Sequence, residues 1–244
     1  MRQAAAESFN RGRPLTERAT RAAVQLALAL ACSITSVAAS QSDPAWQAPS
    51  PSLPMPVSSR HAPAPAGFVS FCLRNPDQCE SGPNAESAVR LTEQTWRQIE
   101  QVNSEVNRTI RPEDDRSHYG RAEYWTIPSD GRGDCEDIAL TKRKLLLAAG
   151  FPARTLLIAV VITPRNIRHA VLTVVSDQGD YVLDNLDSHV KSWGETRYVW
   201  LERQDPATDL GWLAFETNAG TLAAAATSPA ATAESATART LHRE

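Results

Sequence analysis

Hydrophobic residues follow two different patterns along the middle of this 244-residue chain. Over residues 85–109 they recur every three or four positions, which predicts a long amphipathic helix with one buried face. Residues 155–162 form a continuous apolar run, which predicts a central strand covered on both faces. Helices followed by strands predict an α+β domain with an antiparallel sheet. Further apolar runs that predict strands or packing segments lie at 169–175, 181–185, 198–201 and 212–215.

A second helix is predicted over residues 138–149, where strong helix formers dominate and Gly150 ends the run. The preceding residues 133–137 read Gly-Asp-Cys-Glu-Asp, so Cys135 lies in the first turn of this helix. Free backbone N–H groups and the positive end of the helix dipole favour a thiolate at such a position. A thiolate is the nucleophile of cysteine hydrolases and acyltransferases, although a lone cysteine is as often a small buried residue.

A base and an orienting carboxylate for this thiol come later in the chain. His169 begins the apolar run 169–175, and Asp184 lies near the end of the next run. A cysteine nucleophile needs a base to take its proton, and the base needs a partner that fixes its tautomer. Cys135, His169 and Asp184 are therefore a candidate catalytic triad.

The turn between the two strands makes a further prediction. If residues 178–179 formed a two-residue hairpin turn, Asp184 would lie opposite Thr173 and well away from His169. We therefore expect a longer loop, a bulge or a strong twist that brings Asp184 to His169. The alternative partners of the histidine, favoured by a flat and regular hairpin, are Asn185 and Asp187.

Three motifs together resemble a known family. They are Gly-Asp-Cys-Glu-Asp-Ile-Ala at 133–139, His-Ala-Val-Leu at 169–172 and Leu-Asp-Asn at 183–185. This set is similar to that of the bacterial transglutaminase-like cysteine peptidases, which include LapG-type periplasmic proteases that clip large surface adhesins. The resemblance implies a papain-like, transglutaminase-like α+β fold, with N-terminal helices packed on an antiparallel β-sheet. It also implies that the triad residues are Cys135, His169 and Asp184.

The resemblance also implies a reaction. The thiolate attacks a peptide carbonyl and water releases the acyl-enzyme, which makes the protein a cysteine endopeptidase. Its substrate would be a surface or periplasmic protein such as a large adhesin, cleaved in biofilm control. The oxyanion would meet the Cys135 backbone N–H and a second donor, for which Trp125 is the candidate. Two alternatives are a protein-glutamine transglutaminase or amidase with the same triad, and a non-catalytic binding module.

Acidic residues on both sides of the cysteine oppose the effect of the helix, because like charges raise the pKa of a thiol. These carboxylates would either cap the helix or bind a hard cation that neutralises them. The resemblance implies Ca²⁺, with Asp134 and Glu136 as ligands. Asp115, from the acidic loop upstream, is our candidate for a further ligand, and Asp114 and Glu123 are its alternatives. No organic cofactor is expected.

Residues 1–39 have the composition of a secretory signal, with an arginine-rich start, an apolar segment and Val-Ala-Ala at the end. We expect cleavage after Ala39 and a periplasmic protein without stable membrane insertion; an N-terminal anchor helix is the alternative. In an oxidising compartment Cys72 and Cys79 should form a disulfide, which leaves Cys135 as a free thiol.

Composition divides the rest of the chain into three parts. We expect a linker rich in proline, serine and alanine at 40–66, the peptidase domain at 67–216, and a disordered tail at 217–244. The net charge is −3 and no basic stripe interleaved with aromatic residues occurs, which argues against a nucleic-acid partner. The expected partners are a protein substrate and, from the resemblance, an inner-membrane cyclic-di-GMP receptor.

Overall fold

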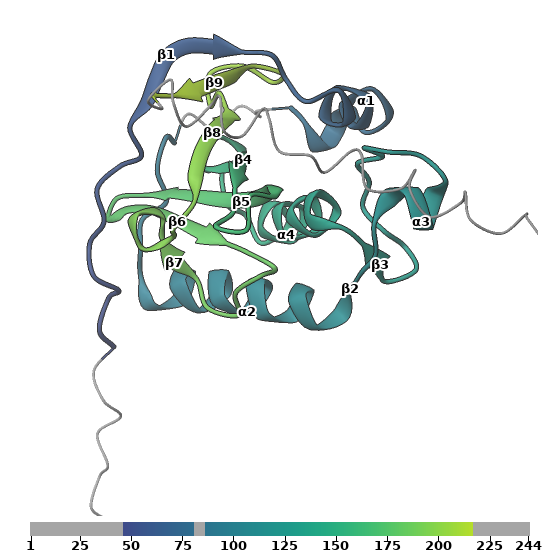
Figure 1. Ribbon diagram of the computed structural model, residues 1–244. Coiled ribbons are helices and arrows are strands. Elements are labelled where there is room, and N and C mark those ends of the chain that lie inside the picture. The colour runs from purple at the N-terminus through teal and green to yellow at the C-terminus, as the bar shows by residue number, and fades with distance from the viewer. Residues whose placement is uncertain (1–45, 81–85, 217–244) are drawn as a thin grey trace, which may run out of the picture. The chain divides into compact units, whose positions relative to one another are not determined.

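A computed structural model describes residues 46–80 and 86–216 (Figure 1). The predicted signal and the predicted tail lie outside these residues. A seven-stranded sheet is the centre of the fold, with strand order β1-β9-β8-β4-β5-β6-β7 and antiparallel neighbours throughout. Its strands are β1 (Val57–Ala62), β4 (Leu156–Ile162), β5 (Arg168–Ser176), β6 (Gly179–Leu183), β7 (Lys191–Ser192), β8 (Val199–Gln204) and β9 (Trp212–Phe215).

Helices pack on this sheet, as the predicted α+β class requires. Helix α4 lies against β4 and β5, and α2 lies against α4 (Figure 1). None of the described helices combines the length and the apolar character that crossing a bilayer requires. The helices are α1 (Ala66–Arg74), α2 (Glu93–Thr109), α3 (Asp115–Tyr119) and α4 (Cys135–Ala148), with 3-10 turns η1 (Pro76–Gln78), η2 (Ala153–Thr155) and η3 (Trp193–Glu195). A small parallel ladder pairs β2 (Arg111–Pro112) with β3 (Arg132–Gly133).

Helix α2 begins later than the apolar spacing predicted, at Glu93. A capping box between Thr92 and Thr95 starts it, because each side chain bonds the backbone N–H of the other residue. Val89, an apolar residue of the predicted helix, instead forms a parallel bridge with Ser176. Hydrophobic spacing thus located the helix, whereas its first residue is set by the cap.

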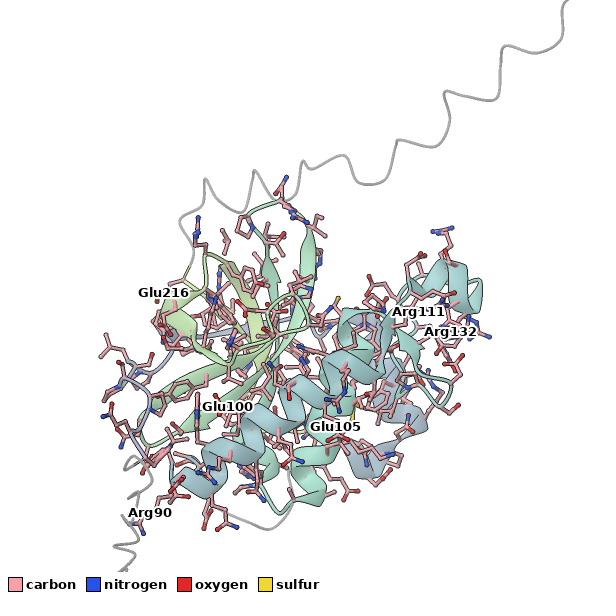
Figure 2. All side chains as sticks on the ribbon, turned by 90° about the horizontal axis from the view of Figure 1, so that it is seen from below. Arg90, Glu100, Glu105, Arg111, Arg132 and Glu216 are labelled. Carbon is pink, nitrogen blue, oxygen red and sulfur yellow. A yellow bond between two sulfur atoms is a disulfide. The ribbon has the colours of Figure 1, made fainter. Side chains whose placement is uncertain are left out.

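The two faces of α2 differ as expected for an amphipathic helix. Ile99, Asn103 and Val106 are buried. Glu100 and Glu105 lie on the exposed side of the same helix (Figure 2). The fully buried amide of Asn103 is the exception on the apolar face, and its contacts are described below.

Strand β1 lies inside the segment expected to be a linker. Val57 pairs with Phe215 and Ala62 pairs with Trp212, so β1 forms one edge of the sheet. Proline-rich flanks are compatible with an edge strand, because one side of such a strand has no ladder to interrupt. The expectation of a linker therefore does not describe residues 57–62.

Apolar side chains cover both faces of the sheet. Strand β4 is buried along its whole length, as its continuous apolar run predicted. The core between the sheet and the helices includes Phe68, Phe71, Ile99, Leu146 and Leu172. The core on the other face includes Met55, Val161, Val171, Trp200 and Phe215.

A disulfide joins Cys72 of α1 to Cys79, which follows η1, with a Cα–Cα distance of 5.6 Å. Both half-cystines belong to the core beneath the helices. Closing so short a loop stabilises the fold by about 2–3 kcal/mol in the chain-entropy model. The pairing matches the prediction, and Cys135 is the free cysteine of the described residues.

Candidate active site

Cys135 is the first residue of α4, and Asp134 is the N-cap. The side chain is half-buried, with Sγ 3.4 Å from the backbone N–H of Ala170 in β5. The thiol also donates a hydrogen bond to Glu136 Oε2 at 2.9 Å. Gly133 permits this tight entry to the helix, because a Cβ there would lie 2.7 Å from a carboxylate oxygen of Asp137.

Strands β5 and β6 form a tight hairpin that settles how the histidine and the aspartate meet. Ser176 pairs with Gly179 across a two-residue turn, and no register shift interrupts the ladder. The predicted longer loop or bulge does not occur. Because the turn lies one residue earlier than that prediction assumed, the register places Asp184 opposite Val171. Asp184 is therefore diagonal to His169 on the same face of the sheet, which is within reach.

The imidazole of His169 contacts Asp184 directly. His169 Nε2 and Asp184 Oδ1 are 2.8 Å apart, and both side chains are buried. Asp184 Oδ1 also accepts a hydrogen bond from Leu186 N–H at 2.9 Å, and Oδ2 accepts one from the Tyr198 hydroxyl. Burial alone would raise the pKa of Asp184, but the hydrogen bonds and the charge of the imidazole outweigh it and lower the pKa.

The two alternative partners of the histidine do not take this place. Asp187 forms an ion pair with Lys191 and accepts a hydrogen bond from His189 N–H at 3.0 Å. The carboxylate that contacts the imidazole is that of Asp184, not that of Asp187 or the amide of Asn185. A regular hairpin thus proves compatible with the partner that it was expected to disfavour.

Cys135 and His169 line the same small cavity, of about 50 Å³. Within the described ranges, no hydrogen bond joins the thiol to the imidazole. Since Nε2 is held by Asp184, Nδ1 is the ring nitrogen left to take a proton from the thiol. A larger cavity, of about 370 Å³, borders Asp184 and Tyr198 but not Cys135. The candidate site is therefore identified by its reactive side chains, Cys135 and His169, and not by the size of its cavity.

Trp125, the candidate oxyanion donor, is buried and lines the small cavity. Its indole N–H donates to Glu123 Oε2 at 3.3 Å. Its ring packs edge-on against Phe68, with centroids 5.9 Å apart. Gly67 makes room for the ring, because a Cβ there would lie 2.2 Å from Trp125 Cδ1. The indole is thus fixed at the cavity, with its N–H already bonded to a carboxylate.

The pKa of the Cys135 thiol lies well above its usual range. Burial is the largest cause, and the charge of Glu136 adds to it, while the N–H of Ala170 acts in the opposite direction. The expectation that the helix start would favour a thiolate is therefore not met by the protein residues alone.

Three aspartates, one from α3 and two from the start of α4, form a separate acidic cluster. Asp115, Asp134 and Asp137 each place a carboxylate oxygen within 4.8 Å of the others. Each also has a buried oxygen without a hydrogen-bond partner, namely Asp115 Oδ1, Asp134 Oδ1 and Asp137 Oδ2. Burial raises the pKa of all three, to about 8 for Asp134 and Asp137. Orphan carboxylate oxygens in this number fit a hard cation such as Ca²⁺.

The cluster overlaps with the predicted ligand set but is not identical to it. Asp115 and Asp134 meet as expected, although they are distant in the sequence. Glu136 belongs to a second group, with Asp134 and Cys135, and its carboxylate accepts the thiol hydrogen bond. Asp137 was not among the predicted ligands. Its spacing of three residues from Asp134 was the available signal, because such residues share one face of a helix.

The two alternative ligands have other contacts. Asp114 is the N-cap of α3 and accepts a hydrogen bond from Ser117 N–H at 3.0 Å. Glu123 accepts the indole hydrogen bond of Trp125. Both carboxylates are thus engaged in local structure.

Comparison with known proteins gives one family and a set of solved structures. The sequence profile described as bacterial transglutaminase-like cysteine proteinase matches residues 58–219. Calcium-bound LapG of Legionella pneumophila is 27% identical, with 53% of this chain and 77% of that chain covered and a TM-score of 0.42. The EGTA-treated form of the same protein is 28% identical, with 49% and 67% covered and a TM-score of 0.42. Comparison with curated proteins gives no match.

Proposed function

Because the chain belongs to the bacterial transglutaminase-like cysteine proteinases, we propose that it cleaves proteins through a thioester on Cys135, with His169 and Asp184 completing the triad. One observation carries this proposal. Cys135 and His169 line one cavity, and the imidazole is held at 2.8 Å by the buried carboxylate of Asp184. A base fixed in this way beside a thiol is the arrangement that acyl transfer requires.

The proposed reaction has two halves. His169 Nδ1 takes the proton of the Cys135 thiol, and the sulfur attacks the peptide carbonyl to form a tetrahedral intermediate. Asp184 holds Nε2–H and stabilises the imidazolium. The imidazolium then gives its proton to the leaving amine, and a thioester remains. Water, deprotonated by His169, attacks the thioester and releases the new carboxyl end and the free thiol.

The oxyanion needs two donors in this reaction. The backbone N–H of Cys135 is one, because it lies at the start of α4, where N–H groups lack helical partners. Trp125 is our candidate for the other, since its indole is fixed at the cavity wall. To serve, the indole N–H would exchange Glu123 for the oxyanion.

We further propose that Asp115, Asp134 and Asp137 hold Ca²⁺ in the active enzyme. Their orphan oxygens support this assignment, because a buried carboxylate oxygen without a donor is costly unless a cation meets it. When bound, the cation would neutralise carboxylates next to Cys135 and thereby lower the pKa of the thiol. Glu136 would remain the carboxylate in direct contact with the sulfur.

We propose an extended, small-residue segment of a large surface or periplasmic protein, such as an adhesin, as the substrate. The small volume at Cys135, about 50 Å³, supports small side chains next to the cleaved bond. A signal at residues 1–39 would deliver the enzyme to the periplasm, where a cyclic-di-GMP receptor of the inner membrane would control it. N-terminal sequencing of the protein from the periplasmic fraction tests the signal, with Ser40 as the expected first residue.

Thiol labelling tests the triad without knowledge of the substrate. The unreduced protein is treated with iodoacetamide with and without Ca²⁺, and the modified peptides are mapped. Selective, calcium-dependent modification of Cys135 that is slowed in His169→Ala would support the proposal. Equally slow labelling in both proteins and both conditions would overturn it.

A second experiment separates hydrolysis from amine transfer. The protein is incubated with an extended Ala/Gly/Thr-rich peptide and, in parallel, with a glutamine-containing protein and a labelled amine. Cleavage of the peptide that is absent in Cys135→Ala supports the endopeptidase. Incorporation of the amine without cleavage would favour a transglutaminase on the same residues.

A further inference from the structure

The carboxylate of Asp184 is held at both of its oxygens. Oδ1 accepts hydrogen bonds from His169 Nε2 at 2.8 Å and from Leu186 N–H at 2.9 Å. Oδ2 accepts one from the hydroxyl of Tyr198, which directly precedes β8. Leu186 N–H belongs to the same short loop as Asp184. Tyr198 is thus the contact that fixes the carboxylate from a segment outside this loop and the β5–β6 hairpin.

Tyr198 touches the histidine as well. The centroids of the two rings are 6.1 Å apart, and the rings meet edge to face, at 71°. The phenol therefore contacts the imidazole with its ring and the carboxylate with its hydroxyl. Tyr198 therefore contacts both members of the His169–Asp184 pair.

Helix α2 holds the main chain of the same loop. Asn107 Nδ2 donates to the carbonyl of Asp184 at 2.7 Å and to the carbonyl of Asp187 at 3.2 Å. Asn103, one helical turn earlier, donates to the carbonyl of Ser188 at 3.2 Å. Both amides lie on the face of α2 turned toward the loop, which explains why a polar residue interrupts its apolar stripe.

A buried lysine connects these amides to the nucleophile helix. Lys142 Nζ donates to Asn103 Oδ1 at 2.8 Å, and the lysine is 1% exposed. Lys142 lies two turns after Cys135 on α4, so both side chains fall on about the same face of the helix. One chain of hydrogen bonds therefore runs from α4 through α2 to the loop that carries Asp184.

We propose that Tyr198 and Asn107 are positioning residues that clamp Asp184 against His169, Tyr198 through the carboxylate and Asn107 through the main chain. The proposal rests on the proposed triad. Its physical basis is rotation: with only Leu186 and His169 as donors, the carboxylate can turn about its Cβ–Cγ bond and loosen its hold on the ring. Without the hydroxyl, Oδ2 would also be a buried acceptor without a partner.

Tyr198→Phe tests the clamp, because it removes one oxygen and keeps the ring. Tyr181→Phe is the matched control: Tyr181 is a buried tyrosine whose hydroxyl donates to the carbonyl of Ser50, outside the site. The rate of Cys135 alkylation by iodoacetamide is measured at saturating Ca²⁺. Tyr198→Phe should lower this rate by about 10-fold or more, the scale of the loss when a metal-bound histidine loses a partner that orients it. Tyr181→Phe should leave it within about 2-fold of the wild type, because the hydroxyl that it removes bonds Ser50 and neither His169 nor Asp184.

Two readouts separate positioning from a merely structural effect. The downfield proton resonance of a histidine N–H bonded to a carboxylate should be present in the wild type, absent in Asp184→Asn, shifted or broadened in Tyr198→Phe and unmoved in Tyr181→Phe. In an Asp184→Asn background, Tyr198→Phe should have no further effect on the alkylation rate, because residues that act as a unit are not additive.

The outcomes distinguish a failure of the proposed role of Tyr198 from a failure of the proposed triad. If Asp184→Asn itself leaves both the rate and the resonance unchanged, the proposed triad fails. If Asp184→Asn lowers the rate but Tyr198→Phe behaves like Tyr181→Phe in both readouts, the triad stands and the role of Tyr198 is overturned.

The main-chain half of the clamp has its own pair of variants. Asn107→Ala removes the donor to Asp184, and Asn75→Ala removes an amide that donates to the carbonyl of Phe71 at 3.0 Å, away from the site. A lower alkylation rate and a shifted resonance in Asn107→Ala alone support the proposal. Equal values for the two variants would overturn the role of Asn107.

Discussion

Asp184 and Asp137 are both buried aspartates of the same site, yet their carboxylates are in opposite situations. Asp184 is 4% exposed and its oxygens accept hydrogen bonds from His169, Leu186 and Tyr198, so its pKa is lowered despite burial. Asp137 is fully buried and one of its oxygens has no donor, so burial and the charge of Asp134 raise its pKa to about 8. Burial is similar, and the supply of donors decides which group keeps its charge.

The difference separates two uses of a buried carboxylate. The carboxylate that the protein satisfies by itself stays ionised and can hold the imidazole of His169 permanently. The carboxylates that the protein leaves unsatisfied are ionised only at a cost, so their state depends on what else binds. The acidic cluster is therefore the part of the site that responds to conditions, and the predictions below test this contrast.

Asp184→Asn should have the largest effect, because the amide cannot hold the imidazole in the same tautomer. Turnover of a cleavable peptide at saturating Ca²⁺ should fall by about 10³–10⁴-fold. Asp187→Asn is the control, since Asp187 lies in the same loop but pairs with Lys191. A loss of similar size in both variants would mean that the charge of the loop, not the contact with His169, is what matters.

Removal of Ca²⁺ should lower the stability more at about pH 8 than at about pH 5. The folded pKa of Asp134 and Asp137 is raised to about 8, so their contribution to stability is full below the unfolded value of 3.8 and is lost as the pH rises through 8. A bound cation offsets this loss, and at about 100 times its Kd it adds about 2.7 kcal/mol. Thermal unfolding with Ca²⁺ and with EGTA at both pH values measures the difference. A calcium effect that is equal at the two pH values would contradict the assignment.

Asp137→Asn should make the cation-free protein more stable. The amide keeps an oxygen for Thr126 N–H, which now bonds Asp137 Oδ1 at 2.7 Å, but it removes a buried charge whose second oxygen, Oδ2, has no donor. We expect a gain of about 1–2 kcal/mol at pH 8 in the presence of EGTA, together with a loss of most of the calcium effect. Urea unfolding measures both quantities. A less stable protein with an intact calcium response would show that Asp137 is structural only.

Glu93→Gln should have the smallest effect and sets the scale for a carboxylate in water. Glu93 is a partly exposed residue in the first turn of α2 and forms an ion pair with Arg97 one turn later. Such pairs contribute about 0.5 kcal/mol or less, and salt should reduce the difference further. A change in unfolding free energy as large as that of Asp137→Asn would mean that burial is not what distinguishes the acidic cluster.

The sequence predicted the parts of the site that local patterns determine. A run of helix formers placed Cys135 at a helix start, and the apolar runs placed His169 and Asp184 on consecutive strands. The helix start of α2 and the hairpin register were missed, because a capping box and a one-residue choice of turn decide them. A two-residue difference in register was enough to make Asp184 look out of reach.

Contacts between distant segments could not be read from the sequence. Asp115 and Asp137 meet only because the chain between them returns to α4, and nothing near Tyr198 or Asn107 indicates Asp184 as their partner. The pKa of the Cys135 thiol is raised, whereas the helix start predicted that it would be lowered, and this difference has the same origin. The helix start is a local feature, whereas burial and the position of the Glu136 carboxylate depend on the packed fold.

The pairing of strand β1 determines when one edge of the sheet can form. Its partner is the last strand of the described domain, since Val57 pairs with Phe215, so this edge of the sheet closes only after the whole domain has been made. Pairings between such distant segments are slow to form. Until then β1 has no strand to pair with, and unpaired edges of this kind invite association with other chains. The β5–β6 hairpin that carries His169 lies in the interior of the sheet and can form independently of that closure.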